Sequence, residues 1–454
     1  MVAGMKELEL YRAAIRRLPS GASEAEAQAE REDILAVSVS GGKPAGSSAS
    51  DQTTLFVRAT GKKTGLAVTQ RIEGEPAAAA LERALENSRY SAADGPEPMN
   101  GPSGEQVREA ELAHSEPEAL KTMAAELEQR LARNDRGLAF SRVSLAETIR
   151  SSGVVNSRGL DIAYSRRTVE ASVALVREGA SGHFAYDGLM SARTPEGISA
   201  EYFLAAHRHW AETQLPPVSC PAGSYRAVIG APVVCNILLT AWQIFSAPFY
   251  MSGNTPLAGR LGEKLFSDAV SVQDLPAAPE SGYQYPFDCE GSAGKPFELV
   301  AGGRAAGLLH TLASARATGA RATGNAGRKT LLSGTLHTNV LAMPKNFRLL
   351  AGQPTRDELL RGLGNGLYVN ASYDEFHSVN IASGAFAIPC RAVAVKNGRM
   401  AGIAGGLTMN GNILDLFSSV EAVADDLCAL PMAILKSYTV SAPSVLVSRL
   451  AISG

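Results

Sequence analysis

The 454-residue sequence has few cysteines, no long apolar run and no apolar leader, and each of these shortages excludes a class of protein. The five cysteines are scattered and form no C-x-x-C pair, which argues against a disulfide framework or a zinc knuckle and for reduced thiols. Residues 1–18 carry six charged side chains, so the uncharged core of a signal peptide is missing. No stretch reaches the ~18 apolar residues that a membrane-spanning helix needs. We therefore expect a cytoplasmic protein with no membrane partner.

The chain also lacks an excess of charge of either sign. Lys and Arg together number 43, Asp and Glu number 45, and the formal net charge is −2. Hydrophobic residues make up 45% of the chain, which is ordinary for a globular protein and excludes a disordered one. Nucleic acid is not an expected partner either, because binding to phosphates needs clustered Lys and Arg side chains.

The spacing of the histidines excludes the common zinc-peptidase motifs. The seven histidines are never four or five residues apart, so neither H-E-x-x-H nor H-E-x-x-x-H occurs. These spacings place two imidazoles on one face of a helix, where both can bind a metal ion. His207 and His209 fall on a predicted helix, whose different faces they occupy, and we expect both at the surface. No G-x-S-x-G nucleophile motif is present.

Charged residues are unevenly distributed, because they make up 26% of residues 1–210 but only 14% of residues 211–454. Hydrophobic periodicity in the first half predicts helices and strands in alternation. The predicted helices are 5–18, 76–90, 115–134 and 196–213, and the predicted strands are 34–40, 54–59, 66–70, 143–151, 160–164 and 168–177. After Pro216-Pro217, short apolar segments alternate with turn residues about every 8–12 positions, which is typical of a β-sandwich or barrel.

The sequence therefore predicts an α+β protein with two domains. Residues 1–215 would form an N-terminal α/β domain, in which helices flank a mixed or antiparallel sheet. Residues 216–454 would form a C-terminal β-rich, barrel-like domain.

Two groups of residues are candidates for chemistry. The tandem A-R-A-T-G repeat at 315–319 and 320–324 continues into N-A-G-R-K, and its basic side chains could bind an anionic group or a peptide carboxylate. The alternative is a solvated loop. Asp374 and His377 could act as a general base and its orienting partner, or as metal ligands, with a solvated turn as the alternative.

Four segments of the second half resemble the TldD/PmbA family. Residues 297–328 (FELVAGGRAAGLLHTLASARATGARATGNAGR) look like the family's pattern of strand, glycine turn and strand, followed by an A-R-x-x-G…T-G-N-A-x-R loop. Residues 383–398 (SGAFAIPCRAVAVKNG) are similar to the family's S-G-x-F…G…I-x-N-G hairpin. Residues 409–417 with 424–427 resemble its G-N…L…I…G-N-D pattern, and residues 442–454 its closing x-P-S-x-L-V…L-x-I-x-G.

The resemblance implies an N-terminal α/β domain, a C-terminal barrel-like domain and subunits that pair around a chamber where unfolded peptides are hydrolysed. In that family the TldD-type subunit carries zinc on H-E-x-x-x-H and a distant cysteine, whereas the PmbA-type (TldE) subunit has no metal motif. The TldD motif would fall at residues 233–245 (VVCNILLTAWQIF), which contain no His, Asp or Glu. Cys235 or Cys428 alone cannot hold zinc, which needs three or four ligands. The chain therefore resembles the PmbA side.

These observations lead to one hypothesis and two alternatives. We expect a metal-free subunit without a cofactor, inactive alone, that shapes the peptide channel while a TldD-like partner supplies zinc. The expected peptide contacts are Arg316, Arg321, Asn325 and Arg328. The alternatives are a hydrolase with an unrecognised site, for which Asp374 and His377 are the best pair, and a non-catalytic peptide-binding homodimer or adaptor.

Overall fold

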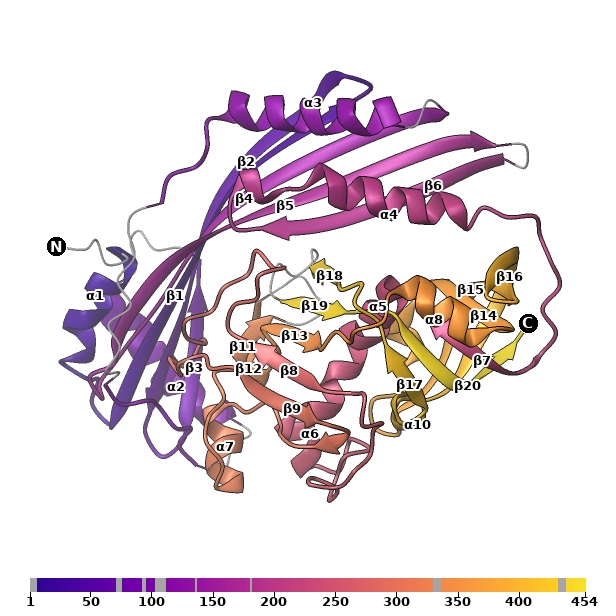
Figure 1. Ribbon diagram of the computed structural model, residues 1–454. Helices are drawn as coiled ribbons and strands as arrows, with labels where there is room; N and C mark the ends of the chain where they lie inside the picture. Colours follow the sequence, from indigo (N-terminus) through magenta and orange to yellow (C-terminus); the bar gives the residue numbers. More distant parts are fainter. Residues whose placement is uncertain are drawn as a thin grey trace. The chain divides into compact units, whose positions relative to one another are not determined.

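The computed structural model describes residues 6–70, 76–91, 95–102, 112–134, 137–179, 182–329, 336–431 and 438–454, which form two compact units (Figure 1). The N-terminal unit consists of Met1–Ala200, Gly282–Gly294 and His310–Ala342, and the C-terminal unit of Glu201–Ser281, Lys295–Leu309 and Met343–Gly454. The sequence predicts one boundary near residue 216, whereas these units interleave along the chain. We call 282–294 the first inserted segment and 310–342 the second, because both belong to the N-terminal unit.

A six-stranded antiparallel sheet, in the order β3-β2-β1-β4-β5-β6, is the framework of the N-terminal unit. Its strands are β1 (Glu24–Ser40), β2 (Lys43–Thr60), β3 (Thr64–Thr69), β4 (Leu138–Asn156), β5 (Asp161–Gly179) and β6 (Gly182–Ala192). β1 begins well before the strand predicted at 34–40. Its first residues alternate alanine with polar side chains, and Ala25, Ala27 and Ala29 are fully buried on one face.

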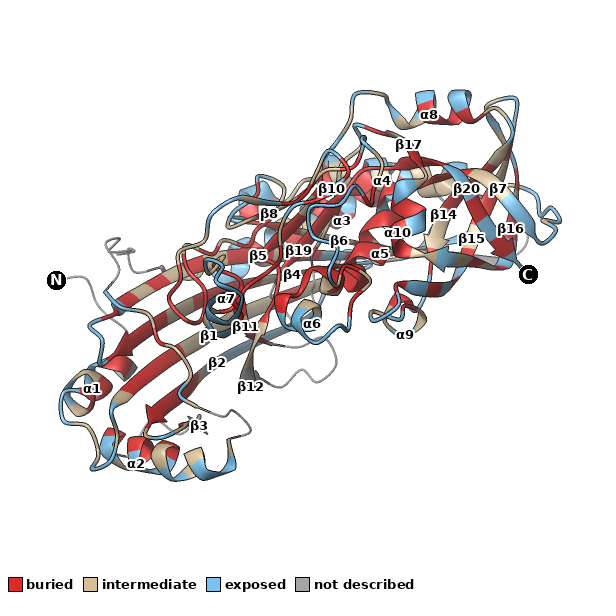
Figure 2. Ribbon diagram, turned by 90° about the horizontal axis from the view of Figure 1, so that it is seen from below, coloured by how far each residue is buried: buried red, intermediate tan, exposed pale blue. Residues whose placement is uncertain are grey.

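Three helices pack on this sheet: α1 (Lys6–Ile15), α2 (Ala77–Asn87) and α3 (Pro117–Asn134). A short 3-10 turn, η1 (Ser88–Tyr90), follows α2. Leu8 of α1 and Leu81 of α2 join the alanine face of β1 in one hydrophobic core. α3 packs on β1 and β4 through its buried leucines, which include Leu120 and Leu131. Figure 2 shows how the buried residues follow the strands and only one side of each helix.

The turn between β1 and β2 is held by a carboxylate from α3. Gly41 and Gly42 have φ values of 59° and 76°, which suit glycine in a two-residue hairpin turn. The backbone N–H groups of Gly41 and Gly42 donate to Glu128 Oε1 and Oε2 at 2.7 and 2.8 Å. The Ser141 hydroxyl donates to Glu128 Oε1 at 2.6 Å, and Glu128 is only 2% exposed. The hairpin tip is therefore fixed to the helix by a buried, hydrogen-bonded charge.

The other face of the sheet carries charged side chains that are themselves buried. Arg150 on β4 pairs with Glu32 on β1. Arg166 on β5 donates to the Gln284 carbonyl oxygen at 2.5 Å, and its guanidinium carbon lies 3.9 Å from the ring centroid of Tyr285. Because a buried charge is tolerated only with partners and hydrogen bonds, the first inserted segment completes this face.

The C-terminal unit contains a closed five-stranded barrel, which confirms the predicted β-barrel-like architecture. Its strands are β7 (Gly223–Ile229), β14 (Gly366–Ser372), β15 (Ala385–Lys396), β16 (Arg399–Asn412) and β20 (Val445–Ser453). They pair in the order β16-β15-β14-β7-β20, and β20 pairs back to β16. β17 (Val420–Val423) adds to β20 outside the closed ring.

A second sheet of the same unit has the order β10-β9-β8-β13-β19-β18. Its strands are β8 (Val272–Leu275), β9 (Phe297–Ala301), β10 (Arg304–Ala305), β13 (Asn346–Leu349), β18 (Cys428–Pro431) and β19 (Thr439–Ala442). The helices of the unit are α4 (Ala200–Glu212), α5 (Ala231–Ala241), α6 (Ala247–Met251), α8 (Arg356–Leu363), α9 (Glu375–Ser378) and α10 (Ile413–Ser418). Short 3-10 turns, η2 (Pro195–Gly197) and η3 (Trp242–Phe245), precede α4 and α6. α5 packs on β14, β18 and β19.

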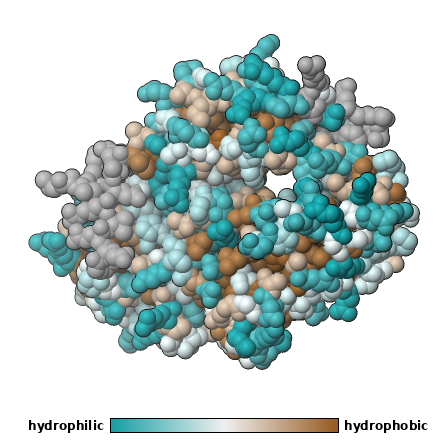
Figure 3. Space-filling model, in the orientation of Figure 1, coloured by the Kyte–Doolittle hydropathy of each residue, from teal (hydrophilic) through white to brown (hydrophobic). Residues whose placement is uncertain are grey.

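In the described part of the chain, no helix combines the length and the apolar character needed to cross a membrane. The outward side of α3 shows the opposite character, because its exposed residues include Glu118, Thr122 and Arg130. Figure 3 shows the largely hydrophilic surface over this helix at the top of the view.

The two histidines of α4 are not surface residues, contrary to the sequence-based expectation. His207 is 5% exposed because it continues the stripe of buried Phe203 and Leu204 at helical spacing. The side chain of His209 is 21% exposed. Arg356 Nη1 donates to His209 Nδ1 at 2.6 Å, so His209 Nε2 carries the proton and donates to the Tyr368 hydroxyl oxygen. Burial and then the charge of Arg356 lower the pKa of His209 to about 4.

Replacing Glu128 by glutamine should destabilise the protein by about 1–3 kcal/mol, because an amide NH₂ would face a backbone N–H of the Gly41–Gly42 turn. Urea unfolding of Glu128→Gln measures the change. Glu126→Gln, at an exposed position of the same helix, is the matched control and should unfold like the wild type. Equal unfolding midpoints for Glu128→Gln and wild type would contradict the turn-clamping role.

The His209 cluster should make stability depend on pH. Its pKa lies near 4 in the folded protein against 6.5 in the unfolded chain, so the unfolded state binds the proton first as the pH falls. The stabilisation is complete above pH 6.5 and is lost towards pH 4, by up to about 3 kcal/mol. The free energy of unfolding of wild type and His209→Gln should therefore differ more at pH 7 than at pH 4.5. A constant difference across this range would show that His209 does not titrate as described.

Candidate functional site

The tandem A-R-A-T-G segment, in the second inserted segment, is divided between a helix and the loop that follows it. The first copy ends α7 (Leu312–Thr318), which Thr311 caps and which Gly319 terminates with a φ of 69°. The second copy leads into β11 (Ala326–Lys329), which pairs with β12 (Leu336–Ala342). The same five residues thus adopt two conformations, because the glycine ends the helix.

The structure separates the four residues expected to contact peptide. Arg316, in the last turn of α7, and Arg321, after it, are exposed. Asn325 and Arg328 are 1% and 3% exposed. Two of the expected contacts are therefore available at the surface, and Arg328 points into a cavity.

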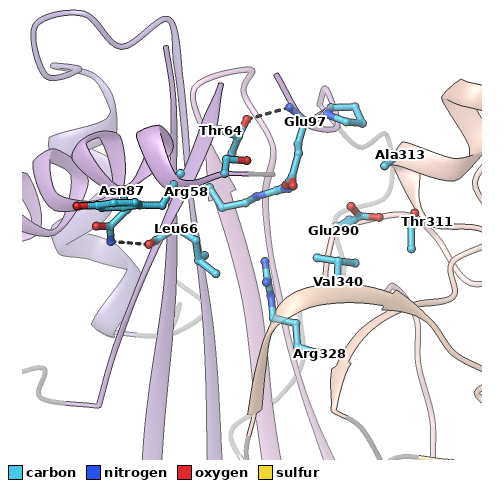
Figure 4. Close-up of a pocket in the computed structure, with 14 residues that line it drawn as sticks. Arg58, Thr64, Leu66, Asn87, Glu97, Glu290, Thr311, Ala313, Arg328 and Val340 are labelled. Carbon is cyan, nitrogen blue, oxygen red and sulfur yellow. Dashed lines mark hydrogen bonds and ion pairs between the residues drawn. The ribbon is translucent and has the colours of Figure 1, made fainter. Parts of the chain in front are cut away.

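This cavity lies within the N-terminal unit and has a volume of about 570 Å³, within the range of small-molecule sites (Figure 4). One wall comes from β2, β3, α2 and the segment after it, and includes Arg58, Thr64, Leu66, Asn87, Tyr90 and Glu97. The other wall comes from the two inserted segments, and includes Glu290, Thr311, Ala313, Arg328 and Val340. Residues more than 200 positions apart thus line one pocket.

Arg58 on β2 forms a buried ion pair in the first wall. It lies directly opposite Glu26 of β1 in the strand register, and the Nη2–Oε1 distance is 2.5 Å. Arg58 and Glu26 are 3% and 1% exposed. Glu97, which is 43% exposed, lies 3.3 Å from Arg58 Nη1. Burial lowers the pKa of Arg58, but the carboxyl groups of Glu26, Glu290 and Glu97 together outweigh burial, so the net pKa is raised.

A carboxylate pair stands in the second wall. The Asp288 side chain accepts hydrogen bonds from the backbone N–H groups of Glu290, Ser292 and Ala326, each at 2.9 Å. Glu290 Oε2 accepts one from the Leu312 N–H at 2.8 Å. Burial and the charge of Asp288 raise the pKa of Glu290 to about 8, although Arg58 acts in the opposite direction. Glu290 therefore holds its proton through much of the neutral range.

Arg328 lies over a cross-strand pair of the sheet. Its Nε donates to Gln28 Oε1 at 2.7 Å, and its guanidinium carbon is 4.7 Å from the ring centroid of Phe56. Gln28 and Phe56 are opposite one another in the register of β1 and β2. Burial lowers the pKa of Arg328. The cation thus rests on an aromatic ring and one amide oxygen within the pocket wall.

Sequence reasoning missed Arg58 and Glu290. Arg58 carried a weak signal, because it interrupts an otherwise apolar strand at 54–59. Glu290 carried none, since only the packing of the first inserted segment against a distant sheet gives it a role. The predicted strand did not show which of its faces is charged and buried.

The alternative catalytic pair lies in the C-terminal unit. His377 Nδ1 and Asp374 Oδ1 are in hydrogen-bond contact around the start of α9. The side chains of Asp374 and His377 are 57% and 73% exposed, so water surrounds the pair. The structure therefore brings the two groups together in solvent.

The helix at the position of the TldD zinc motif is α5. Nine of its eleven residues are buried, and Trp242 at its C-terminal end donates to the Tyr438 hydroxyl oxygen at 3.2 Å. The Cys235 thiol is 3.4 Å from the Cys428 carbonyl oxygen, and burial raises the pKa of Cys235. In the described residues no three His, Cys, Asp or Glu side chains gather as metal ligands. Two neighbouring thiols do not supply the three or four ligands of a zinc site, so the residues present do not fit zinc.

Two family models match the chain. The PmbA/TldA metallopeptidase central domain matches residues 110–207, and the PmbA/TldA metallopeptidase C-terminal domain matches residues 222–454. A metalloprotease of Methanothermobacter thermautotrophicus is 24% identical over 296 residues, 64% of this chain and 63% of that protein. A metalloprotease PmbA homolog of Haemophilus influenzae is 29% identical over 198 residues, 44% of this chain and 39% of that protein. The matched part thus spans less than two thirds of either curated relative.

The fold also matches a solved structure. TldE from Thermococcus kodakarensis superposes with a TM-score of 0.81 at 19% identity, covering 98% of this chain and 100% of that one. The likeness covers both units, and at this identity it concerns the fold. The C-terminal family model contains all four motifs that carried the resemblance. The chain therefore belongs to the TldD/PmbA metallopeptidase family.

Proposed function

We propose that the chain is the metal-free subunit of a cytoplasmic TldD/PmbA-type metallopeptidase complex. The observation that carries this proposal is α5, which contains no His, Asp or Glu and in which nine of eleven residues are buried. A helix packed in this way supports a structural role, because α5 itself carries no charged side chain that burial would have to desolvate. Zinc and the hydrolytic step would come from a TldD-like partner subunit.

The proposed role of this chain is to hold unfolded peptide. Arg316 and Arg321 are exposed cations on either side of the α7 C-terminus, and Gly319 between them bears no side chain. Such side chains can reach acidic groups and backbone carbonyl oxygens of a passing chain. With the partner, this subunit would enclose the peptide in a chamber, as a heterodimer or a higher assembly.

One observation favours a second candidate, a hydrolase that uses Asp374 and His377. The two side chains are in contact, as a base and its orienting carboxylate would be. A third candidate, a peptide-binding homodimer or adaptor, shares the binding role without the chemistry. The experiments below separate these from the leading proposal.

The purified chain should contain far less than one zinc ion per molecule and should not hydrolyse an unfolded peptide. Added TldD-like subunit from the same organism should form a complex that contains zinc and cleaves the peptide. Metal analysis, size-exclusion chromatography and a peptide cleavage assay measure the three properties. Stoichiometric zinc with cleavage by the chain alone would refute the metal-free role. Metal-independent cleavage that disappears in His377→Ala would establish the second candidate. Binding of peptide without any cleavage, even after the TldD-like subunit is added, would establish the third candidate.

In the complex, the double variant Arg316→Gln/Arg321→Gln should raise the KM for an acidic unfolded peptide by about three- to tenfold and leave kcat close to wild type, since two exposed charge contacts are lost. The difference should shrink at high salt because exposed charges are screened. Arg130→Gln, an exposed change on α3, is the matched control. An unchanged KM at low salt would remove these two arginines from the peptide path.

A further inference from the structure

The cavity of the N-terminal unit presents a cation and an acid to the same half-open space. Figure 4 shows Arg328 rising from β11 towards β2 and β3, with Glu290 beside Thr311 and Ala313. We propose that this cavity binds short peptides with two free ends, holding the carboxylate at Arg328 and the ammonium group at Glu290. The inference rests on the proposed function only in taking peptides as the source of such a ligand.

Arg328 is suited to a terminal carboxylate. Its guanidinium group is 3% exposed and held in place by Gln28 and Phe56, so its position does not depend on the ligand. A planar guanidinium can offer parallel N–H groups to the two oxygens of a carboxylate. At a side chain as buried as Arg328, such a charge-assisted pair is stronger than at a wet surface.

Glu290 is suited to a terminal ammonium group. Its Oε2 is fixed by the Leu312 N–H, and among the described residues no further hydrogen bond of this carboxyl group is found. The charged groups that interact with Glu290 are Asp288 on its own segment, Arg58 and Glu26 on β2 and β1, and Arg328 on β11. Burial contributes most to the raised pKa of Glu290, which is about 8, and the charge of Asp288 adds to it, whereas Arg58, which is already paired with Glu26, opposes it. A bound ammonium group would favour the ionised form of Glu290, so peptide binding would release the proton that this carboxyl group holds at neutral pH.

The remaining lining residues determine which peptide lengths and side chains the site accepts. Leu66, Ala313 and Val340 are apolar, and Tyr90 is 75% exposed where it lines the cavity. A volume of about 570 Å³ admits a few residues rather than a folded chain. Recognition of both ends with an apolar middle predicts selection by length and by free termini, with little dependence on the side chains between them.

Isothermal titration of the full chain without partner or metal tests the proposal. The probes are alanine, dialanine, trialanine and the better of these peptides in two blocked forms, N-acetylated and C-amidated. Each blocked form should bind about tenfold more weakly or worse than the free peptide, since each loses one charge-assisted pair. Because the assay needs no catalysis, the peptide-binding proposal can be refuted while the metal-free subunit role stands. The metal-free subunit role can likewise be refuted while peptide binding in the cavity stands.

Variants of the two side chains assign each end of the ligand. Arg328→Gln should weaken binding of the free peptide about tenfold but leave the affinity for the C-amidated form nearly unchanged. Glu290→Gln should likewise weaken binding of the free peptide but leave the affinity for the N-acetylated form nearly unchanged. Arg130→Gln and Glu126→Gln, at exposed positions of α3 outside the lining, are the matched controls. Thermal melting confirms that each variant is folded. Should Arg328→Gln not fold, the blocked peptides on the wild-type chain still decide the question.

Three results would overturn the proposal. The first is the absence of binding by either peptide up to roughly 10 mM, a concentration that detects even weak ligands. The second is equal affinity for free and blocked peptides. The third is alanine binding as tightly as the better peptide, which would make the site one for free amino acids.

Discussion

The N-terminal unit depends on the pairing of charges on one face of its sheet. Glu26 with Arg58 and Glu32 with Arg150 are cross-strand partners on this face. An unpaired charge at these depths would cost several kcal/mol, whereas a paired and hydrogen-bonded one is tolerated. The face therefore had to be covered by polar and aromatic groups that match it. The inserted segments provide them, and the cavity is the part of this face that they leave open.

The C-terminal unit follows a simpler principle. Its barrel closes through the pairing of β16 with β20, so the ring itself leaves no strand edge that needs protection. α5 packs on β14 of this barrel and on two strands of the second sheet with an almost entirely apolar sequence. The helix contains no His, Asp or Glu, and nine of its eleven residues are buried. The fold is retained there by packing, and the donors of a metal site are not needed for it.

Much of the architecture was readable from hydrophobic periodicity, and the failures have identifiable causes. The helix predicted at 115–134 is α3, and the turn-rich second half is the barrel-containing unit. The first part of β1 was missed because alanine makes a weak apolar face, and His207 was misplaced because an imidazole can occupy a buried stripe. The cavity could not be predicted, since Glu290 meets Arg58 only through packing across more than 200 residues of sequence. Local patterns carry no information about such contacts.

The interleaving of the two units has a consequence for synthesis of the protein. The six strands of the N-terminal sheet end at residue 192, whereas the inserted segments that cover their charged face follow only at 282–294 and 310–342. The N-terminal unit can therefore be completed only after residue 342 has been synthesised, and not while its sheet emerges. Until then, the arginine and glutamate side chains of this face would have water as their hydrogen-bond partner. Because exposed apolar surface promotes aggregation, a charged face is the less aggregation-prone one during this interval.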